Sequence, residues 1–360
     1  ERIRNFKKMI KKIIYISQTR LDYSLNSVCI KGLNENGIEV VGFHVKNRGI
    51  VGLLRAVSFY RHNSKNIEVV MTGYDSPALV VFLRFFCRKK IIYNAVLSVY
   101  ERMIISRELA PQFSLKATYY WFLDFVAVHF ANLTMVESHH QADYFRKIFK
   151  VSGKKLYRNW IGVDEDKFFY DSTVSKFPVF TVIFRGALMP EAGAEYVIQA
   201  AKILEKEDIK FIMQSGGMLL DKIRHMVDEI NPKNLEFRFN LLPAEELRIL
   251  MQKCHLSIGQ VSGHERLIRT IPHKAYESLA MKLPYLTASN TGILELLTPD
   301  DTCLTCNPAD AKSLAEKILW AKYNLQELKR IAENGYKLYQ DKLRSCILAK
   351  NLLDKIMDAS

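Results

Sequence analysis

The sequence lacks an apolar run long enough to cross a membrane as a helix. Such a helix needs roughly 18 to 20 consecutive apolar residues. The two longest apolar stretches are both interrupted: Arg84 lies within Ala78–Cys87, and Asp124 and His129 lie within Tyr119–Phe130. We therefore expect a protein without a membrane-spanning helix.

The start of the chain also lacks the features of a secretion signal. Its basic segment, Arg2–Lys12, runs directly into the strand-like Ile13–Ile16 with no cleavage-type tail. We therefore expect no signal peptide. Because the sequence has no initiator methionine, we also expect it to begin inside a longer gene product.

Cysteines are few, with six among 360 residues, and they are scattered along the chain. Scattered cysteines are typical of free thiols in a reducing compartment. Cys303 and Cys306 have the spacing of a metal or redox pair, but no second pair or histidine cluster accompanies them. We therefore expect a cytoplasmic protein without a bound metal.

Acidic residues are scarce in the first half of the chain. Residues 1–170 contain 27 Lys and Arg against 14 Asp and Glu, a net charge of +13, whereas residues 171–360 contain 25 against 24. This asymmetry predicts that the first half faces an anionic surface or an anionic acceptor. The alternative is a basic surface that only aids solubility. No interleaved aromatic and basic RNA-binding motif is present, so we expect no nucleic-acid partner.

The sequence does contain a regular alternation of β-branched and helical segments. Its composition, 49% hydrophobic and 25% charged over 360 residues, is typical of two globular domains. In the first half we expect strands at 12–17, 38–44, 67–71, 90–94 and 133–136, and helices at 25–36, 49–62 and 115–131. In the second half we expect strands at 179–184, 210–214, 235–239, 256–259 and 284–287, helices at 194–204, 219–230, 243–253 and 272–281, and mostly helix from 309 to 356. Strands separated by helices predict parallel, doubly wound α/β sheets covered on both faces.

Glycine-rich and polar turns follow four strands of the second half. They are Arg185-Gly186, Ser215-Gly216-Gly217, Gly259-Gln260 and Ser289-Asn290-Thr291-Gly292. Each turn alone is an ordinary strand-to-helix connection. Together, at one edge of a sheet, their backbone N–H groups and the Arg185 side chain are suited to a diphosphate. The second half is therefore predicted to bind a nucleotide.

The most specific segment is Pro272-His273-Lys274-Ala275-Tyr276-Glu277-Ser278-Leu279-Ala280, which precedes the strand opening at Pro284. It resembles the Pro-x-Lys-x-x-Glu-x-x-Ala donor-site helix of glycosyltransferase family 4. The resemblance covers about residues 179–320 well. Asn159–Asp164 looks like the interdomain turn of that family, and a weaker likeness to one bacterial, cell-surface polysaccharide branch runs through Leu97–Arg102 and Arg107.

The resemblance implies a GT-B fold, in which two Rossmann-like doubly wound domains face a central cleft. We expect an acceptor domain at 1–170, a nucleotide-sugar donor domain at 171–340, and a C-terminal helix at 341–360 that packs back on the first domain. The implied reaction retains the anomeric configuration, needs no metal, and uses a UDP- or GDP-linked hexose as co-substrate with no other cofactor. The implied acceptor is a membrane-associated lipid or polysaccharide at the inner face of the membrane.

The resemblance also assigns roles to residues. Glu277 would accept hydrogen bonds from ribose hydroxyls, because a carboxylate is an acceptor that takes two donors at once. Lys274, one turn earlier on the same helix face, would point toward the diphosphate. The predicted donor-binding residues are Arg185, Gly186, Gly216, Gly259, Gln260, Glu265, Asn290, Thr291, Gly292 and Glu295. On the acceptor side we expect Glu101, Arg102 and Arg107.

The chain departs from the family pattern at one important position. The family commonly has a glutamate eight residues before the helix glutamate, and here that position is Arg269; Glu265 is out of register. We predict that Arg269 is catalytic and neutralises the leaving diphosphate. The same departure keeps open a nucleotide-sugar-binding protein without turnover. A sugar-nucleotide epimerase or a phosphorylase on the same fold is a further alternative.

Two further features of the first half suit a membrane surface. The basic groups Arg2–Lys12 and Arg88-Lys89-Lys90 could lie on anionic lipid, and the aromatic run 119–122 fits either a membrane interface or the core of a helix.

Overall fold

The computed structural model describes residues 10–240 and 242–358. Most of the predicted basic start, Arg2–Lys12, lies outside these residues. The chain divides into two compact units: the first comprises residues 1–164 and 342–360, and the second comprises residues 165–341. We predicted the boundary after residue 170, whereas the two units meet between residues 164 and 165, a few residues earlier.

The first unit is built on a parallel six-stranded sheet with the order β2-β1-β3-β4-β5-β6. Its strands are β1 (Lys12–Ser17), β2 (Glu39–His44), β3 (Val69–Thr72), β4 (Lys90–Val96), β5 (Leu133–Val136) and β6 (Leu156–Arg158). Its helices are α2 (Ser24–Glu35), α3 (Ile50–Asn63), α4 (Pro77–Arg84), α5 (Leu115–Phe130), α6 (His139–Phe149) and α14 (Ser345–Asp358).

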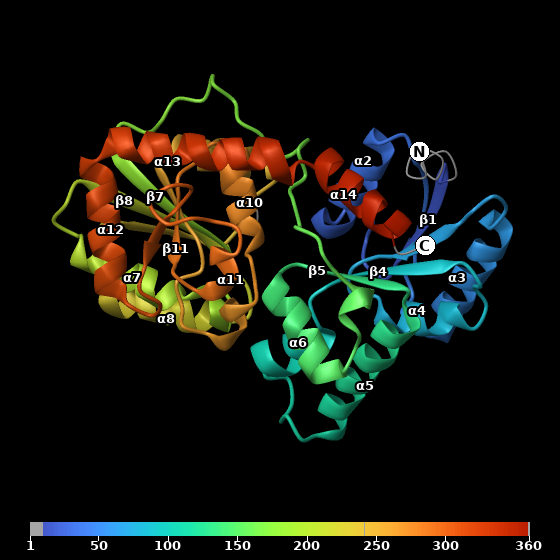
Figure 1. Cartoon of the computed structure of the whole chain (residues 1–360). Coiled ribbons are helices and arrows are strands. Elements are labelled where there is room, and N and C mark those ends of the chain that lie inside the picture. Colours follow the sequence, from blue (N-terminus) through green and yellow to red (C-terminus); the bar gives the residue numbers. More distant parts are fainter. Residues whose placement is uncertain (1–9, 241, 359–360) are drawn as a thin grey trace. The chain divides into compact units, whose positions relative to one another are not determined.

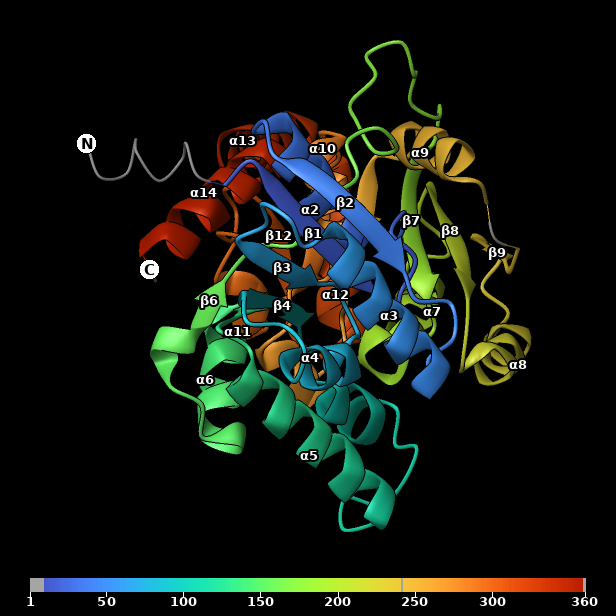
Figure 2. The same ribbon diagram turned by 90° about the vertical axis from the view of Figure 1, so that its right-hand side faces the viewer.

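Alternate residues of the central strand β1 enter two different cores of the first unit. Ile14 and Ile16 pack with residues of α3, α4, α5 and α6, and Figure 2 shows α3, α4 and α5 following one another. Ile13 and Tyr15 pack with residues of α2 and α14. Successive side chains of a strand point to opposite faces, so the sheet is covered by helices on both.

The helix α14 lies beside α2, although the two are far apart in the sequence (Figure 1). Asn36 Nδ2 donates to the carbonyl of Cys346 at 2.8 Å, and Ser345 Oγ donates to Glu35 Oε2 at 2.9 Å. A Cβ on Gly32 would stand only 2.1 Å from the carbonyl oxygen of Ser345, so this close approach requires glycine. The C-terminal helix is therefore part of the first unit's core.

The second unit repeats the plan, with a parallel sheet of order β12-β11-β10-β7-β8-β9. Its strands are β7 (Phe180–Ala187), β8 (Ile209–Gly216), β9 (Leu235–Arg238), β10 (Leu256–Ile258), β11 (Tyr285–Ala288) and β12 (Leu304–Cys306). Its helices are α7 (Ala194–Ile203), α8 (Leu220–Ile230), α9 (Ala244–Lys253), α10 (His273–Ala280), α11 (Thr291–Leu294), α12 (Ala311–Tyr323) and α13 (Leu325–Leu338).

The two faces of the second sheet differ in what covers them. Val182 and Phe184 of β7 pack with residues of α7, α8 and α12 in one apolar core (Figure 1). Leu256 and Ile258 of β10 enter the same core, so Ser257, which lies between them, points to the opposite face of the sheet. There Ser278 Oγ of α10 donates to Ser257 Oγ at 3.0 Å. The helix predicted to bind the donor therefore lies on the face opposite α7, held by a buried polar contact.

Most predicted elements lie where the alternation of the sequence places them, and Gly37 ends α2 with the positive φ of 79° expected of a C-cap glycine. The α-helices and strands not predicted are α4, α6, β6, β12 and the short α11, part of which was predicted as a turn. Across residues 10–240 and 242–358, no helix combines the length and the apolar character that crossing a membrane requires.

Candidate functional site in the second unit

The second sheet changes direction between β7 and β10. From β7 the chain proceeds to β8 and β9 on one side, and then returns to place β10 on the other side of β7. In doubly wound sheets, ligands bind outside the carboxyl ends of the strands at such a switch point. Arg185 and Gly186 close β7, and Gly259 and Gln260 follow β10, so these four predicted donor residues lie at the switch point.

Two glycines at this edge have backbone roles that no other residue could fill. Gly186 has a φ of 109°, a conformation that strains any side chain. A Cβ on Gly259 would stand 2.2 Å from Tyr285 Oη, and Gly259 N donates to the carbonyl of Leu286 at 2.7 Å. The chain therefore passes close to β11 here.

Helix α10 brings a buried ion pair to the same edge. The Arg185 guanidinium pairs with the carboxylate of Glu277, whose side chain is only 7% exposed, and Glu277 Oε1 lies 3.0 Å from His273 Nδ1. Burial lowers the pKa of Arg185 to about 10 because desolvation disfavours the charged form. The pair holds Glu277 in one orientation at the end of β7.

Lys274 is the most unusual residue of the site. It is buried, its Nζ lies 4.3 Å from the ring centroid of Phe184, and no hydrogen-bond partner for Nζ lies within the described residues. Burial, with a smaller contribution from the nearby charge of Arg185, lowers its pKa to about 7. A buried amine without a hydrogen bond is costly to the fold, and it is ready to accept an anionic ligand.

The segment before α10 carries Arg269 and Glu265. A short 3-10 helix, Glu265–Ile268, ends at Arg269, whose Nη2 lies 3.5 Å from Glu265 Oε1. This segment packs on the start of α11: Thr291 Oγ1 donates to the carbonyl of Ile268 at 3.1 Å, and a Cβ on Gly292 would stand 2.6 Å from the carbonyl oxygen of Leu267. The structure therefore gathers a second group of predicted donor residues around α11.

The remaining predicted residues lie at the margins of these two groups. Asn290 Nδ2 donates to the carbonyl of Ser262 at 3.3 Å, just before α11, and Glu295 follows that helix. Gly216 ends β8, where a Cβ would stand 3.6 Å from the carbonyl oxygen of Phe239 and would meet no closer atom. Their roles stay predictions.

The sequence analysis missed three residues that shape the site. His273 lies one helical turn from Glu277, a spacing that could have identified it. The buried carboxylate of Glu191 pairs with Arg266, and Glu191 partly offsets the lowering of the Lys274 pKa. This second pair joins residues far apart in the sequence, so no local pattern indicates it.

Removing the carboxylate of Glu277 should destabilise the protein. Glu277→Gln leaves the buried Arg185 cation without its counter-ion, and we expect the free energy of unfolding to fall by about 3 kcal/mol, measured by urea denaturation. The matched control is Glu327→Gln, which breaks the exposed pair with Arg330 and should change stability by less than about 1 kcal/mol. Equal effects of the two substitutions would contradict the buried pair.

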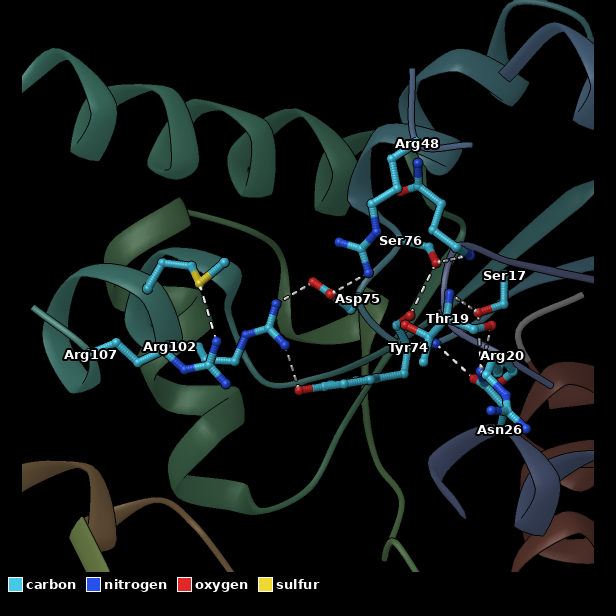
Figure 3. Close-up of polar contacts among 12 residues, drawn as sticks. Ser17, Thr19, Arg20, Asn26, Arg48, Tyr74, Asp75, Ser76, Arg102 and Arg107 are labelled. Carbon is cyan, nitrogen blue, oxygen red and sulfur yellow. Dashed lines mark hydrogen bonds and ion pairs between the residues drawn. The ribbon is translucent and has the colours of Figure 1, made fainter. Parts of the chain in front are cut away.

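The predicted acceptor residues lie in the first unit, around a turn of π-helix (Glu101–Ser106) that follows β4. Glu101 is fully buried, where its Oε2 accepts a hydrogen bond from Gln141 Nε2 at 2.8 Å. Arg102 instead reaches the loop after β3, where it pairs with Asp75 and donates to Tyr74 Oη at 3.1 Å (Figure 3). Arg107 Nη1 lies 3.8 Å from the sulfur of Met103.

The cysteines carry free thiols, of which Cys303 and Cys306 are buried. Burial raises the thiol pKa of Cys303 and of Cys306 to about 12. Within residues 10–240 and 242–358, no group of three or more His, Cys, Asp or Glu side chains is placed to hold a metal ion.

Solved structures resemble the whole chain at low sequence identity. HepE from Anabaena, solved with UDP-glucose, is 16% identical with a TM-score of 0.71, covering 96% of this chain and 99% of that chain. Sucrose-phosphate synthase from Thermosynechococcus elongatus is 14% identical with a TM-score of 0.76, covering 97% and 100%. A glycosyltransferase from Rickettsia africae is 13% identical with a TM-score of 0.65, covering 96% and 98%. Among curated proteins, no significant match is found.

These likenesses show the GT-B fold of two Rossmann-like α/β domains, so the predicted fold class is confirmed. Residues 172–338, which lie within the second unit, match the family model described as glycosyl transferases group 1. The family likeness is therefore one of the second unit, and the likeness to the solved structures is one of fold.

Proposed function

We propose that the protein is a retaining, metal-independent glycosyltransferase that moves a hexose from a UDP- or GDP-linked donor to a lipid-linked or polysaccharide acceptor. The observation that carries the proposal is the buried group of Arg185, Lys274 and Glu277 at the switch point of the second sheet. A nucleoside diphosphate presents both ribose hydroxyls and phosphate oxygens, and this group offers a carboxylate acceptor next to cations.

In this reaction Lys274 and the backbone amides of the switch point bind the pyrophosphate, while Glu277 accepts hydrogen bonds from the ribose. The bond between the sugar's anomeric carbon and the diphosphate breaks as the acceptor oxygen bonds to the same face of the ring. The departing phosphate takes the proton of the acceptor hydroxyl, and Arg269 stabilises its negative charge. The protein thus stabilises charge and forms no covalent intermediate.

HepE has been solved in complex with UDP and with UDP-glucose, which favours a uridine-linked donor within this proposal.

The first unit takes the acceptor and lies against the inner face of an anionic membrane. The excess positive charge of the chain lies in its first half. Around the start of α5, Phe113 and Leu115 are exposed next to Lys116. Within the aromatic run 119–122, Trp121 packs on the core while Phe122 is exposed. Exposed apolar side chains beside basic ones suit a lipid surface and the synthesis of a cell-surface polysaccharide.

A second candidate function is nucleotide-sugar binding without turnover. The observation that favours it is Arg269, which stands where family members commonly carry a glutamate.

The proposal is tested by incubating the full chain with UDP- and GDP-hexoses and a membrane extract in the presence of a metal chelator. We expect release of the nucleoside diphosphate together with a product whose new glycosidic bond keeps the donor's anomeric configuration by NMR. Binding of a nucleotide sugar without release of diphosphate would favour the second candidate. Loss of activity with the chelator would contradict the metal-independent reaction.

A further inference from the structure

The first sheet has a switch point of its own, between β1 and β3. From β1 the chain proceeds to β2 on one side, and β3 then lies on the other side of β1. The segments that follow β2, β3 and β4 supply a set of side chains here, which we call the arginine cluster: Arg48, Tyr74, Asp75, Arg102 and Arg107. Ligands of doubly wound sheets bind at such an edge.

The loop after β3 is built to hold Asp75 in one place. A Cβ on Gly73 would stand 2.5 Å from Ser17 Oγ, so glycine lets this loop approach the end of β1. Tyr74 N donates to Asn26 Oδ1 at 3.0 Å, and Asp75 has a φ of 57°, which Asp and Asn tolerate better than most residues. The carboxylate of Asp75 therefore has a fixed position at the switch point.

Two guanidinium groups share this one carboxylate (Figure 3). Arg102 pairs with Asp75 Oδ1, and Arg48 Nη2 lies 3.0 Å from Asp75 Oδ2. The side chains of Asp75 and Arg102 are 10% and 11% exposed, whereas that of Arg48 is 57% exposed. Arg48 is therefore a second cation on the same carboxylate, and its side chain is open to solvent.

A third guanidinium adds to the positive charge. Arg107 lies close enough to Tyr23 to interact with it: burial raises the pKa of the Tyr23 phenol, and the charges of Arg102 and Arg107 partly offset that rise. Three guanidinium groups stand against the carboxylate of Asp75 and that of the buried Asp124, whose charge interacts with Arg102 and whose pKa is raised to about 7 by desolvation. The cluster therefore carries an excess of positive charge.

We propose that the arginine cluster binds a phosphate group carried by the acceptor. The planar guanidinium matches the oxygens of a phosphate with two parallel hydrogen bonds, and an excess of positive charge suits a phosphate dianion better than a singly charged carboxylate. Arg102 is held ready by Asp75 and Tyr74, so little entropy is lost when an anion arrives. The inference rests on the proposed function, because it names the chemistry of that reaction's acceptor.

An uncharged aromatic surface, formed by Tyr23 and Tyr74, lies beside the arginine cluster. The rings of Tyr23 and Tyr74 are stacked with centroids 5.9 Å apart, and the Arg102 guanidinium lies 5.5 Å from the centroid of Tyr74. Tyr23 is exposed. An apolar ring face next to a phosphate site fits the sugar ring or the alkyl chain to which that phosphate is attached.

The test measures binding by the full chain, with UDP or GDP in excess so that phosphate probes do not enter the donor site. The probes are hexyl phosphate for a lipid-like source, glucose 1-phosphate for a sugar source, and hexanoate as the carboxylate comparison. We expect one of the phosphates to bind more tightly than hexanoate, and which one binds identifies the source. Equal binding of hexanoate would overturn the inference.

Two substitutions with opposite expected signs sharpen the test. Arg48→Ala, at an exposed side chain, should weaken binding of the phosphate about tenfold or more. Asp75→Asn removes the competing negative charge, keeps a residue that tolerates the positive φ, and should tighten binding severalfold. Arg146→Ala, which removes an equally exposed arginine on α6, should have no effect.

The outcomes separate this inference from the proposed function. If Arg48→Ala and Arg146→Ala bind the phosphates alike while UDP or GDP still binds, the acceptor inference fails and the donor site stands. If Asp75→Asn weakens binding as much as Arg48→Ala does, the cluster is structural and the inference fails. If neither nucleotide binds any variant, the proposed function fails. Phosphate binding by Arg48→Ala and Arg146→Ala, measured without nucleotide, then still shows whether the arginine cluster binds phosphate.

Discussion

Replacing Lys274 with methionine is expected to lower kcat/KM for the nucleotide sugar about a hundredfold or more and, at the same time, to raise the free energy of unfolding by about 1 to 4 kcal/mol near neutral pH. The loss of activity follows because the ammonium group that we propose to bind the pyrophosphate is gone. The gain in stability follows because a buried amine with a pKa of about 7 and no hydrogen-bond partner in the described structure is replaced by an apolar side chain of similar length.

The opposite signs of these two effects make the prediction specific. Substituting a residue that serves the fold lowers activity and stability together. Substituting a residue that is kept for ligand binding lowers activity but raises stability. The matched control is Lys222→Met, at an exposed position of α8, which should change neither quantity appreciably. A Lys274→Met protein that is less stable than the wild type, or that keeps its activity, would contradict the assigned role.

Arg269→Ala is expected to lower kcat about a hundredfold, with a smaller effect on KM for the donor. Arg269 is 14% exposed at its side chain and follows the 3-10 helix that packs on α11. Its predicted role is to stabilise the charge that develops on the leaving diphosphate, so its removal should affect the transition state more than the bound donor.

Steady-state kinetics of Arg269→Ala and Arg269→Lys, with Arg330→Ala as an exposed control in the same unit, would test this role. We expect the lysine variant to recover part of the lost turnover, because it keeps the positive charge without the planar fork. Turnover of Arg269→Ala within about threefold of the wild type would remove Arg269 from the catalytic group.

Most of the fold could be predicted from the sequence because it depends on two local signals, the β-branched runs and their alternation with helical segments. β-branched runs such as Ile13–Ile16 and Leu133–Val136 become buried strands, and the alternation with helices requires parallel order. The missed elements are short or lack such a signal: β6 and β12 have three residues each, and α6 is a polar helix that buries few side chains. Their formation depends on neighbours in space.

The same distinction holds for the candidate site. Lys274 and Glu277 were found because they lie one turn apart in a contiguous motif. The pairs Arg185–Glu277, Glu191–Arg266 and Arg48–Asp75 each join segments that are far apart in the sequence. Which segments meet is decided by strand order and by close approaches such as that of Gly73, and no pattern within one segment contains that information.

The central claim is that Lys274 meets a pyrophosphate at the switch point of the second sheet. It is tested most directly by calorimetric titration of the full chain with UDP and GDP at about pH 8 in two buffers of different ionisation enthalpy. With a pKa of about 7, Lys274 is mostly neutral at that pH before the ligand arrives. An anion next to the amine favours its charged form and raises its pKa, so binding draws a proton from solution.

We therefore expect one of the two nucleotides to bind with uptake of up to about one proton per diphosphate, and its affinity to fall as pH rises above about 7. Lys274→Met should bind weakly and without proton uptake. If neither nucleotide binds, or if binding takes up no proton and is unchanged in Lys274→Met, the donor site does not lie where we have placed it.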